Sequence, residues 1–324
     1  MKNPLALAAI ALAAAMMLSG CLFNVSLGPE AKPFKEVVID GTATAKIAVV
    51  EVSGFISDEE DEGLLGKKRP SMPDAFAEVL AKAAKDDDVK GLIVRINSPG
   101  GSVSTSDVMY SELVRYRIKT GNPVYASIVG LGTSGGYYIA NGADEIYAQP
   151  TSLTGSIGVI AVSLDFEGLM EKLGVRDKTY KSGENKTVFT PFRPDTPKES
   201  EIIKGIIAEL HGRFVDVVAE GRRGTLTKEK VIELADGRPY TAQQALDAGL
   251  IDGIAYPNDV VTLMRSAIKE PKARVVMYKR PGTHKGSIYS MSNVNGNTII
   301  NVDASGLAAR SGVRFMYLWD GYIN

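Results

Sequence analysis

The chain has 324 residues, of which 44% are hydrophobic, so it is long enough for one large domain or two ordinary ones with a substantial core. Its 37 basic and 38 acidic residues leave a formal net charge of -1. This balance argues against a nucleic-acid-binding protein and against attachment to an anionic membrane surface by charge.

An export signal is predicted at the N-terminus. Lys2 precedes an uncharged apolar run from Leu5 to Leu18, which is short for a bilayer span and typical of the centre of a secretory signal peptide. The ending Leu18-Ser19-Gly20-Cys21 resembles the lipobox of bacterial lipoprotein precursors. That resemblance implies a signal peptide over residues 1–20 and lipidation of Cys21, the only cysteine in the chain. The alternative is an uncleaved membrane anchor; either way we expect a membrane-anchored, extracytoplasmic protein of the cell envelope.

A tether and the first folded elements should follow. Residues 21–45 mix Pro, Gly and charge without periodicity, which suits a tether between lipid and domain. Lys46 to Ile56 is β-rich and should open the folded part, whereas Ser57 to Arg69 predicts a mobile loop. Pro73 then fits the first turn of a helix. The apolar positions of that helix recur at helical spacing: Phe76, Val79, Leu80 and Ala83.

Strands and helices alternate over the next 60 or so residues. Val89 to Asn97 is nearly continuously apolar, as in a buried parallel strand, and Ser98-Pro99-Gly100-Gly101 ends it. Val103 to Thr120 predicts a helix. Val124 to Ile128 predicts a second strand, and a further helix leads to a short strand over Glu145 to Ala148. This order predicts βαβ crossovers and a mainly parallel sheet.

The C-terminal part changes character. Helices are predicted from Pro197 to Arg222, after Thr227, and from Thr241, where Thr-Ala-Gln-Gln is a capping-box pattern. We expect one folded domain over residues 46–270. The remaining residues, 271–324, form a Gly-, Asn- and Ser-rich tail with a terminal aromatic cluster, for which an assembly contact, a plug for a neighbour's cleft and disorder all remain open.

Ser134 is the leading candidate for a catalytic residue. It lies within Gly130 to Ala140 (GLGTSGGYYIA), where a predicted strand gives way to a helix, so its hydroxyl can project from the sheet while the glycines permit close approach. A serine nucleophile needs a base. The two histidines, His211 and His284, fall in the long helix and in the tail. The other candidate is a lysine kept neutral by burial, and KSGENK at 181–186 offers two.

Four linked motifs carry a family resemblance. They are LIVRINSPGGSV at 92–103, GTSGGYYIA at 132–140, TGSIGV at 154–159 and KSGENK at 181–186. Together they closely resemble signal peptide peptidase A, a membrane-associated Ser/Lys protease family with a Clp-protease/crotonase-like fold. The resemblance runs from about Lys46 to Tyr256. It implies an α/β fold of repeated ββα units, with a mainly parallel sheet and a helical C-terminal part, in the short, single-copy form of the family.

The resemblance also implies site residues. They are the nucleophile, the general base, a serine that orients the base, and two oxyanion-binding amides: Ser134, Lys186, Ser156, Gly101 and Gly135, respectively. Lys181 is the second candidate base, and an ordinary turn serine remains the alternative reading of Ser156. Two amides aimed at the transition-state oxygen are worth a few kcal/mol, which suits acyl transfer.

The implied activity is endopeptidase cleavage of hydrophobic peptides, such as remnant signal peptides, at the membrane. Lys186 would take the proton of Ser134, the serine would attack a peptide carbonyl, and water would release the acyl group. No metal, nucleotide or other cofactor is implied. The family forms rings or domes, so a homo-oligomer is expected, and the dyad could form within one protomer or between two.

Three other functions compete. Gly130-x-Gly132-x-x-Gly135 matches the dinucleotide fingerprint, but the acidic residue wanted about 20 positions on is missing, because Pro150 to Leu153 stand there. A crotonase-type acyl-CoA enzyme would share the fold; the export signal argues against it, because coenzyme A chemistry is cytoplasmic. The last alternative is a catalytically silent scaffold or binding lipoprotein of the same fold.

Overall fold

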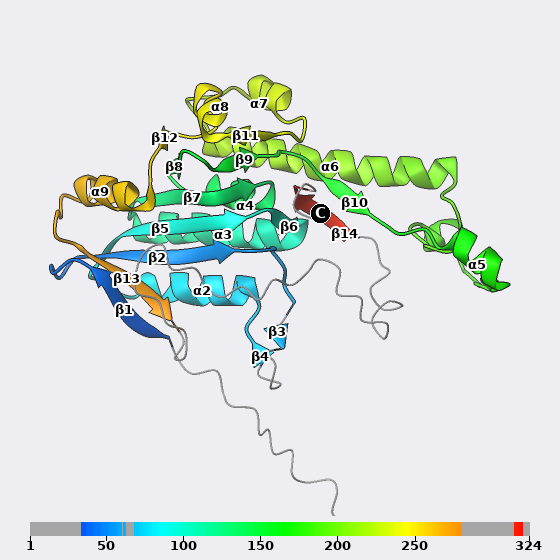
Figure 1. The fold of residues 1–324 in the computed structure, drawn as a ribbon, viewed down its shortest axis with the longest axis horizontal. Coiled ribbons are helices and arrows are strands. Elements are labelled where there is room, and N and C mark those ends of the chain that lie inside the picture. Colours follow the sequence, from blue (N-terminus) through cyan, green and yellow to red (C-terminus); the bar gives the residue numbers. More distant parts are fainter. Residues whose placement is uncertain (1–33, 60, 63–67, 280–313, 320–324) are drawn as a thin grey trace, which may run out of the picture.

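The computed structural model describes residues 34–59, 61–62, 68–279 and 314–319. A largely parallel sheet lies at its centre, with helices packed around it (Figure 1). The predicted α/β class is therefore confirmed. The predicted signal peptide, Cys21 and the first part of the tether lie outside the described residues. None of the helices in the described ranges is both long enough and apolar enough to cross a bilayer.

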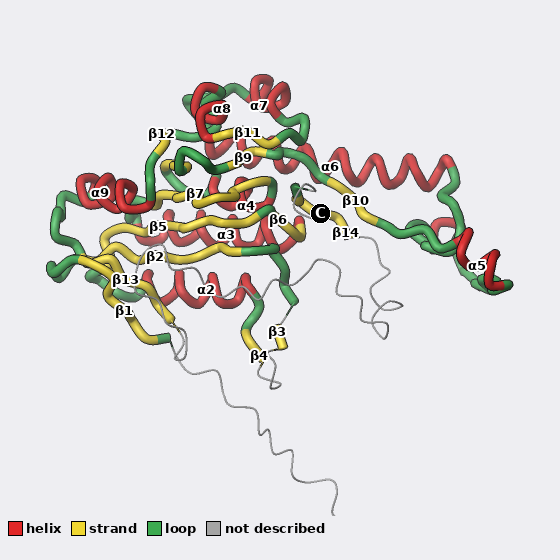
Figure 2. The backbone as a smooth tube through the Cα atoms, in the orientation of Figure 1, coloured by secondary structure: helices red, strands yellow, loops and turns green. Residues whose placement is uncertain are grey.

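The strands, drawn in yellow in Figure 2, have these bounds: β1 Lys35–Asp40, β2 Lys46–Ser53, β3 Asp61–Glu62, β4 Lys68–Arg69, β5 Val89–Ser98, β6 Gly100–Ser102, β7 Val124–Thr133, β8 Glu145–Ala148, β9 Leu153–Gly155, β10 Ile160–Val162, β11 Pro239–Thr241, β12 Gly253–Ile254, β13 Arg274–Lys279 and β14 Arg314–Leu318. The helices have these bounds: α2 Met72–Ala83, α3 Val103–Thr120, α4 Gly135–Ala140, α5 Glu167–Leu173, the 3-10 turn η1 Glu184–Thr187, α6 Pro197–Gly221, α7 Lys228–Leu234, α8 Ala242–Asp247 and α9 Pro257–Ala267.

The main sheet runs in the order β1-β13-β2-β5-β7-β8-β12, and β9 and β11 extend it beside the end of β7. Every pair from β13 to β12 is parallel, whereas β1 joins the edge antiparallel to β13. The predicted strand at 89–97 is the central strand β5. Arg95, the one charged residue in its buried stretch, is 3% exposed and pairs with Glu51 of β2 at 3.2 Å.

The two faces of the sheet are covered differently. Alternate residues of β2, β5 and β7, such as Val50, Val94 and Ala126, pack with α2, α3 and α4. The intervening residues, such as Val49 and Ile93, pack beneath α9 on the other face. Because side chains alternate along a strand, a sheet covered on both faces has nearly continuous apolar strands, as the sequence predicted.

Two sequence boundaries need correction. Residues 35–40, expected in the tether, form β1, and residues 274–279, expected in the tail, form β13. Both have β-rich sequences, KEVVID and RVVMYK, which pair with each other, and β13 also pairs with β2. The sheet therefore needs both strands, and the folded domain extends beyond residues 46–270 at each end.

A projecting segment separates the sheet from the long helix. We call residues 160–196 the arm; it contains β10, α5 and η1, and neither α5 nor η1 buries a single residue. In Figure 1, α5 and the N-terminal part of α6 lie at the far right, away from the main sheet. Helix α6 begins with the capping box of Thr196 and Glu199, and its buried apolar residues lie in its C-terminal half.

Candidate active site

Ser134 occupies a strained turn between a strand and a helix. β7 ends at Thr133 and α4 begins at Gly135, so Ser134 alone links them, with φ 52° and ψ -115°. A positive φ is costly for a residue with a side chain, and it persists only where the surroundings hold it. Here the Ser134 N–H donates to the Gly155 carbonyl at 2.7 Å, and its carbonyl accepts from the Tyr138 N–H at 2.8 Å. The turn is therefore fixed from both sides.

The Ser134 hydroxyl is buried and has no hydrogen-bond partner among the described residues. The residue as a whole is 1% exposed. A buried hydroxyl without a partner costs free energy of about 1–3 kcal/mol, so such groups are uncommon and call for an explanation. A strained turn that presents an unpaired hydroxyl is the geometry expected of a nucleophile.

Gly101 lies in β6, and a side chain there would collide with backbone. A Cβ built on Gly101 would stand 2.1 Å from the Ile56 carbonyl oxygen. Gly135 is equally restricted, because its Cβ would stand 2.5 Å from Ser106 Oγ and 3.2 Å from the Gly100 Cα. The loop after β5 and the start of α4 thus approach each other closely. The structure brings the two predicted oxyanion residues into one place beside Ser134.

Ser156 lies one residue beyond the strand that holds Ser134. Gly155 pairs with Thr133, and Ser156 follows with a φ of 51°, a second positive value at a non-glycine residue. Its Oγ donates to the Gly237 carbonyl at 3.0 Å. In this structure the Ser156 hydroxyl therefore binds the loop that contains Gly237 and not a lysine.

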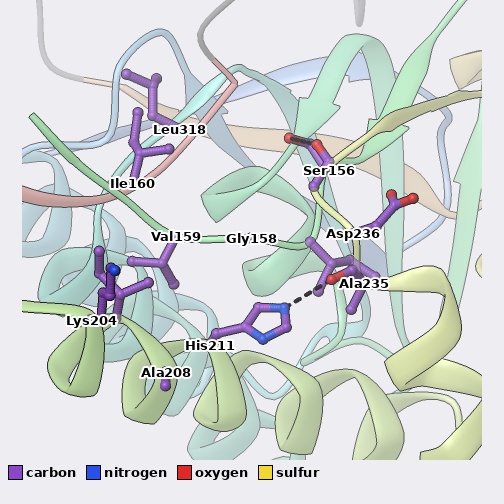
Figure 3. Close-up of a pocket in the computed structure, with 13 residues that line it drawn as sticks. Ser156, Gly158, Val159, Ile160, Lys204, Ala208, His211, Ala235, Asp236 and Leu318 are labelled. Carbon is purple, nitrogen blue, oxygen red and sulfur yellow. Dashed lines mark hydrogen bonds between the residues drawn. The ribbon is translucent and has the colours of Figure 1, made fainter. Parts of the chain in front are cut away.

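A cavity of about 440 Å³ opens next to Ser156, between β10, α6 and the loop around residue 236 (Figure 3). Apolar side chains line most of it, including Val159 and Ile160. His211 lines it too, with Nε2 2.9 Å from the Ala235 carbonyl oxygen, and Ser134 is not among the lining residues. The His211 ring nitrogen is thus engaged with Ala235 and not with Ser134, whose hydroxyl is unpaired in the described part of the chain. His284 lies outside the described residues.

Lys186 lies apart from this group. It belongs to η1 on the arm, its side chain is exposed, and its ammonium has no hydrogen bond or ion pair within the described ranges. Lys181, the second candidate base, donates to the Glu184 carbonyl at 2.8 Å and to Thr187 Oγ1 at 3.0 Å. The segment that carries both lysines follows α5 and a non-regular stretch. A single chain therefore assembles Ser134, Gly101, Gly135 and Ser156 without either lysine.

Comparisons with known proteins identify the family. The model of peptidase family S49 matches residues 117–270. The chain is 36% identical to an Enterococcus faecium protein assigned as signal peptide peptidase SppA, over 77% of this chain and 71% of that protein. The chain belongs to peptidase family S49. It is accordingly a serine-type peptidase, and the resemblance seen in the four motifs is confirmed.

Two further S49 relatives show how the chain compares in length. It is 35% identical to protease 4 of Haemophilus influenzae, over 69% of this chain and 35% of that protein. It is 30% identical to the chloroplastic serine protease SPPA of Arabidopsis thaliana, over 80% of this chain and 38% of that protein. The matched region thus spans little more than a third of these longer proteins.

The S49 match includes Ser134, Ser156 and Lys186 but leaves out Gly101 and β14. Sequence reasoning also missed the part that β14 plays. Its Tyr317 pairs with Gly101, which places the C-terminal strand against the candidate oxyanion residues. The aromatic cluster from Phe315 to Trp319 was the available signal, but nothing in the sequence indicated which part of the domain it would contact.

Proposed function

We propose that this S49 peptidase is an endopeptidase that cleaves hydrophobic peptides, with Ser134 as nucleophile and Lys186 as general base. The observation that carries the proposal is the buried, unpaired Ser134 hydroxyl on its strained turn, next to the closely packed Gly101 and Gly135. A catalytically silent scaffold would not need a serine on a strained turn next to two glycines whose backbone packs too closely for a side chain.

We further propose that Lys186 reaches Ser134 across an interface between two copies of the chain. Lys186 is exposed on the arm, and the arm is the most apolar part of the described surface. Of the thirteen large hydrophobic side chains exposed in the described residues, seven lie on the arm: Val162, Leu164, Leu169, Leu173, Val175, Tyr180 and Phe192. Exposed apolar surface of this kind is typical of protein-protein contacts. A neighbour packed on the arm would remove Lys186 from water.

Burial is what would make this lysine a base. Removing an ammonium group from water favours its neutral form, and only a neutral amine can accept the Ser134 proton. Ser134 Oγ would then attack the peptide carbonyl, and the N–H groups of Gly101 and Gly135 would bind the oxyanion. Lys186 would protonate the leaving amine, and water would release the acyl group by the reverse proton path. The Ser156 hydroxyl, which now donates to Gly237, would turn to the lysine.

The proposed substrates and location follow from the same features. The cavity next to Ser156 is lined by Ile157, Val159 and Ile160, which suits apolar side chains. A lipid on Cys21 would hold the enzyme at a membrane face, where released signal peptides are concentrated. More than one acyl chain would be required, because one chain alone binds a bilayer weakly and reversibly.

Turnover of a fluorogenic apolar peptide by the chain lacking residues 1–21 tests the dyad. Ser134→Ala and Lys186→Ala should each lower kcat/KM by about 10³-fold or more, since loss of a nucleophile or its base removes the covalent route. Lys181→Ala distinguishes the two candidate lysines, and Lys172→Ala on α5 is the matched control; both should retain activity. Equal turnover by the wild type, Ser134→Ala and Lys186→Ala would rule out this mechanism. No turnover by the wild type on any apolar peptide would favour the scaffold.

A further inference from the structure

The pairing between β5 and β7 is interrupted just before the candidate active site. The two strands pair in parallel up to Ile96 and Ile128, and they pair again only at Ser98 and Gly132. Asn97 alone therefore lies opposite three residues of β7. An uneven pairing of this kind disrupts the backbone ladder, so other contacts have to set the distance between the two strand ends.

The Asn97 side chain bridges this interruption. Its Oδ1 accepts a 3.0 Å hydrogen bond from the Leu131 N–H, in the part of β7 that leads to the nucleophile turn. Gly130, just before, has φ 85°, and a Cβ there would stand 3.0 Å from the same oxygen. The Asn97 carbonyl accepts from the Gly54 N–H at 2.9 Å. Asn97 thus joins the end of β7 to the end of β2, and its approach explains a glycine at position 130.

Ser98 ties the turn that follows β5 to the same strand end. Its side chain is fully buried, and its Oγ donates to the Gly54 carbonyl at 2.6 Å. The same oxygen accepts from the Gly100 N–H at 3.1 Å. The Ser98 carbonyl oxygen lies 3.0 Å from where a Cβ on Gly136 would stand, so the first turn of α4 packs directly on this residue. The hydroxyl thus bonds the glycine turn on one side and β2 on the other.

These bonds fix the direction of the Gly101 amide. The Gly100 N–H is held by Ser98, and the Ser102 N–H donates to the Ile56 carbonyl at 2.8 Å. The Gly100 carbonyl accepts from the Ile56 N–H at 2.9 Å. Successive residues of a strand point their N–H groups to opposite sides, so the N–H of Gly101 points away from Ile56. Ser98 holds the residue before Gly101, and Ile56 holds the residue after it.

We infer that Asn97 and Ser98 are positioning residues, which together hold the Gly101 amide at a fixed distance from Ser134 Oγ. This inference rests on the proposed function and adds to it the two side chains that align its oxyanion donor with its nucleophile. Neither side chain needs to touch the substrate. A catalytic group is effective only if the bonds behind it hold it to within about 0.5 Å of its working position.

The kinetic test is Ser98→Ala in the full chain with a fluorogenic apolar peptide. Bonds to the oxyanion form only in the transition state, so kcat should fall about 10- to 50-fold while KM changes less than about twofold. Ser71→Ala is the matched control, because Ser71 is also a buried serine but its hydroxyl caps α2 by bonding Asp74. It should lower the melting temperature and keep the wild-type kcat.

Two outcomes separate this inference from the function on which it rests. Wild-type kcat in Ser98→Ala, together with an inactive Ser134→Ala, would overturn the inference and leave the proposed nucleophile in place. Full turnover by Ser134→Ala would remove the proposed function itself.

A pair of inhibitors distinguishes positioning from a general disturbance of the fold. A peptide aldehyde accepts Ser134 Oγ at its carbonyl carbon, and its oxygen then occupies the oxyanion position. The matching peptide alcohol cannot add to the serine. In Ser98→Ala the Ki of the aldehyde should rise about tenfold or more, whereas the Ki of the alcohol should change less than about twofold. An equal rise for both inhibitors would contradict a positioning role.

Asn97 provides a second variant if Ser98→Ala does not fold. Asn97→Ala removes the acceptor of the Leu131 N–H, and kcat should fall about fivefold with the same preference for the aldehyde. Asn97→Asp keeps an oxygen at that position and should recover most of the lost kcat. Wild-type kcat in Asn97→Ala, or an equal loss in the two Asn97 variants, would show that this bond does not position the site.

Discussion

The body and the arm of this S49 peptidase contrast in how they hold functional residues. In the body, the Ser134 turn is fixed by backbone hydrogen bonds to Gly155 and Tyr138 and surrounded by buried strands and helices. On the arm, Lys186 lies on a short 3-10 turn with no buried residue, and the same arm carries seven exposed large apolar side chains. One half of the proposed dyad is complete within the chain, and the other half needs a surface that the chain does not supply to itself.

This contrast shows which parts of the proposed site also stabilise the fold and which do not. The Ser134 turn is built into the same parallel sheet that stabilises the fold, so changes there should affect both activity and stability. The arm adds little to the stability of one chain, so changes there should affect activity through assembly alone. Three predictions sharpen the comparison, and a fourth decides it.

Of these three predictions, the one with the largest expected effect concerns Gly101 in the body. In Gly101→Ala the new methyl would stand 2.1 Å from the Ile56 carbonyl oxygen, so β6 must shift and the Gly101 amide must leave its proposed oxyanion-binding position. We expect kcat/KM to fall by about 10²- to 10³-fold. Gly212→Ala in α6 is the control, because a methyl there meets nothing within 4 Å. It should keep full activity and raise the unfolding free energy by about 0.5–1 kcal/mol. A fully active Gly101→Ala protein would remove Gly101 from the site.

Ion pairs should differ in the same way between body and arm. Arg222 is 3% exposed and holds Asp252 with two hydrogen bonds of 2.7 and 2.8 Å. Asp252→Asn should lower the unfolding free energy by about 3 kcal/mol, because it leaves a buried guanidinium without its counter-charge. Between η1 of the arm and the N-terminus of α6, Lys198 and Glu184 are both largely exposed, so Glu184→Gln should not change the melting temperature measurably. Similar melting temperatures for the two variants would contradict this division.

Acid should loosen the connection between the arm and the N-terminus of α6 before the sheet unfolds. The Arg193 guanidinium, which donates 2.6 and 2.8 Å hydrogen bonds to Glu199, lowers the pKa of that carboxyl to about 2 from its ordinary 4.5. Because the folded pKa is the lower one, this contribution is complete above about pH 4.5 and lost as the pH falls toward 2. Hydrogen exchange at residues 193–200 should therefore rise over that window. In Glu199→Gln it should be high already at neutral pH and change little with acid.

Much of the fold could be predicted from sequence because its signals are local. The helix from Val103 to Thr120 has its predicted bounds, and the capping box at Thr241 forms as expected. The strand β13 was missed for the opposite reason: its partners, β1 and β2, lie more than 220 residues earlier in the chain, and no local pattern reports such pairing.

The candidate site likewise has features with a local sequence signal and features that depend on residues far apart in the chain. The glycines around Ser134 marked the turn because only a tight strand-to-helix connection needs them, and the structure places Ser134 there. The place of Tyr317 beside Gly101 depends on a contact between residues 216 apart, which no spacing could reveal. Under the proposed function, Lys186 meets Ser134 only in an assembly, so a single sequence could name the lysine without showing which serine it serves.

The central claim is that a lysine on one copy serves the serine of another, and mixing two inactive variants tests it most directly. Ser134→Ala supplies an intact Lys186, and Lys186→Ala supplies an intact Ser134. If the two chains, expressed together, assemble at random, about a quarter (one half times one half) of the sites should receive both groups and recover activity. Recovery near that level is the predicted result. Activity that stays at the level of the separate variants, while mass measurement shows both chains in one assembly, would contradict the account.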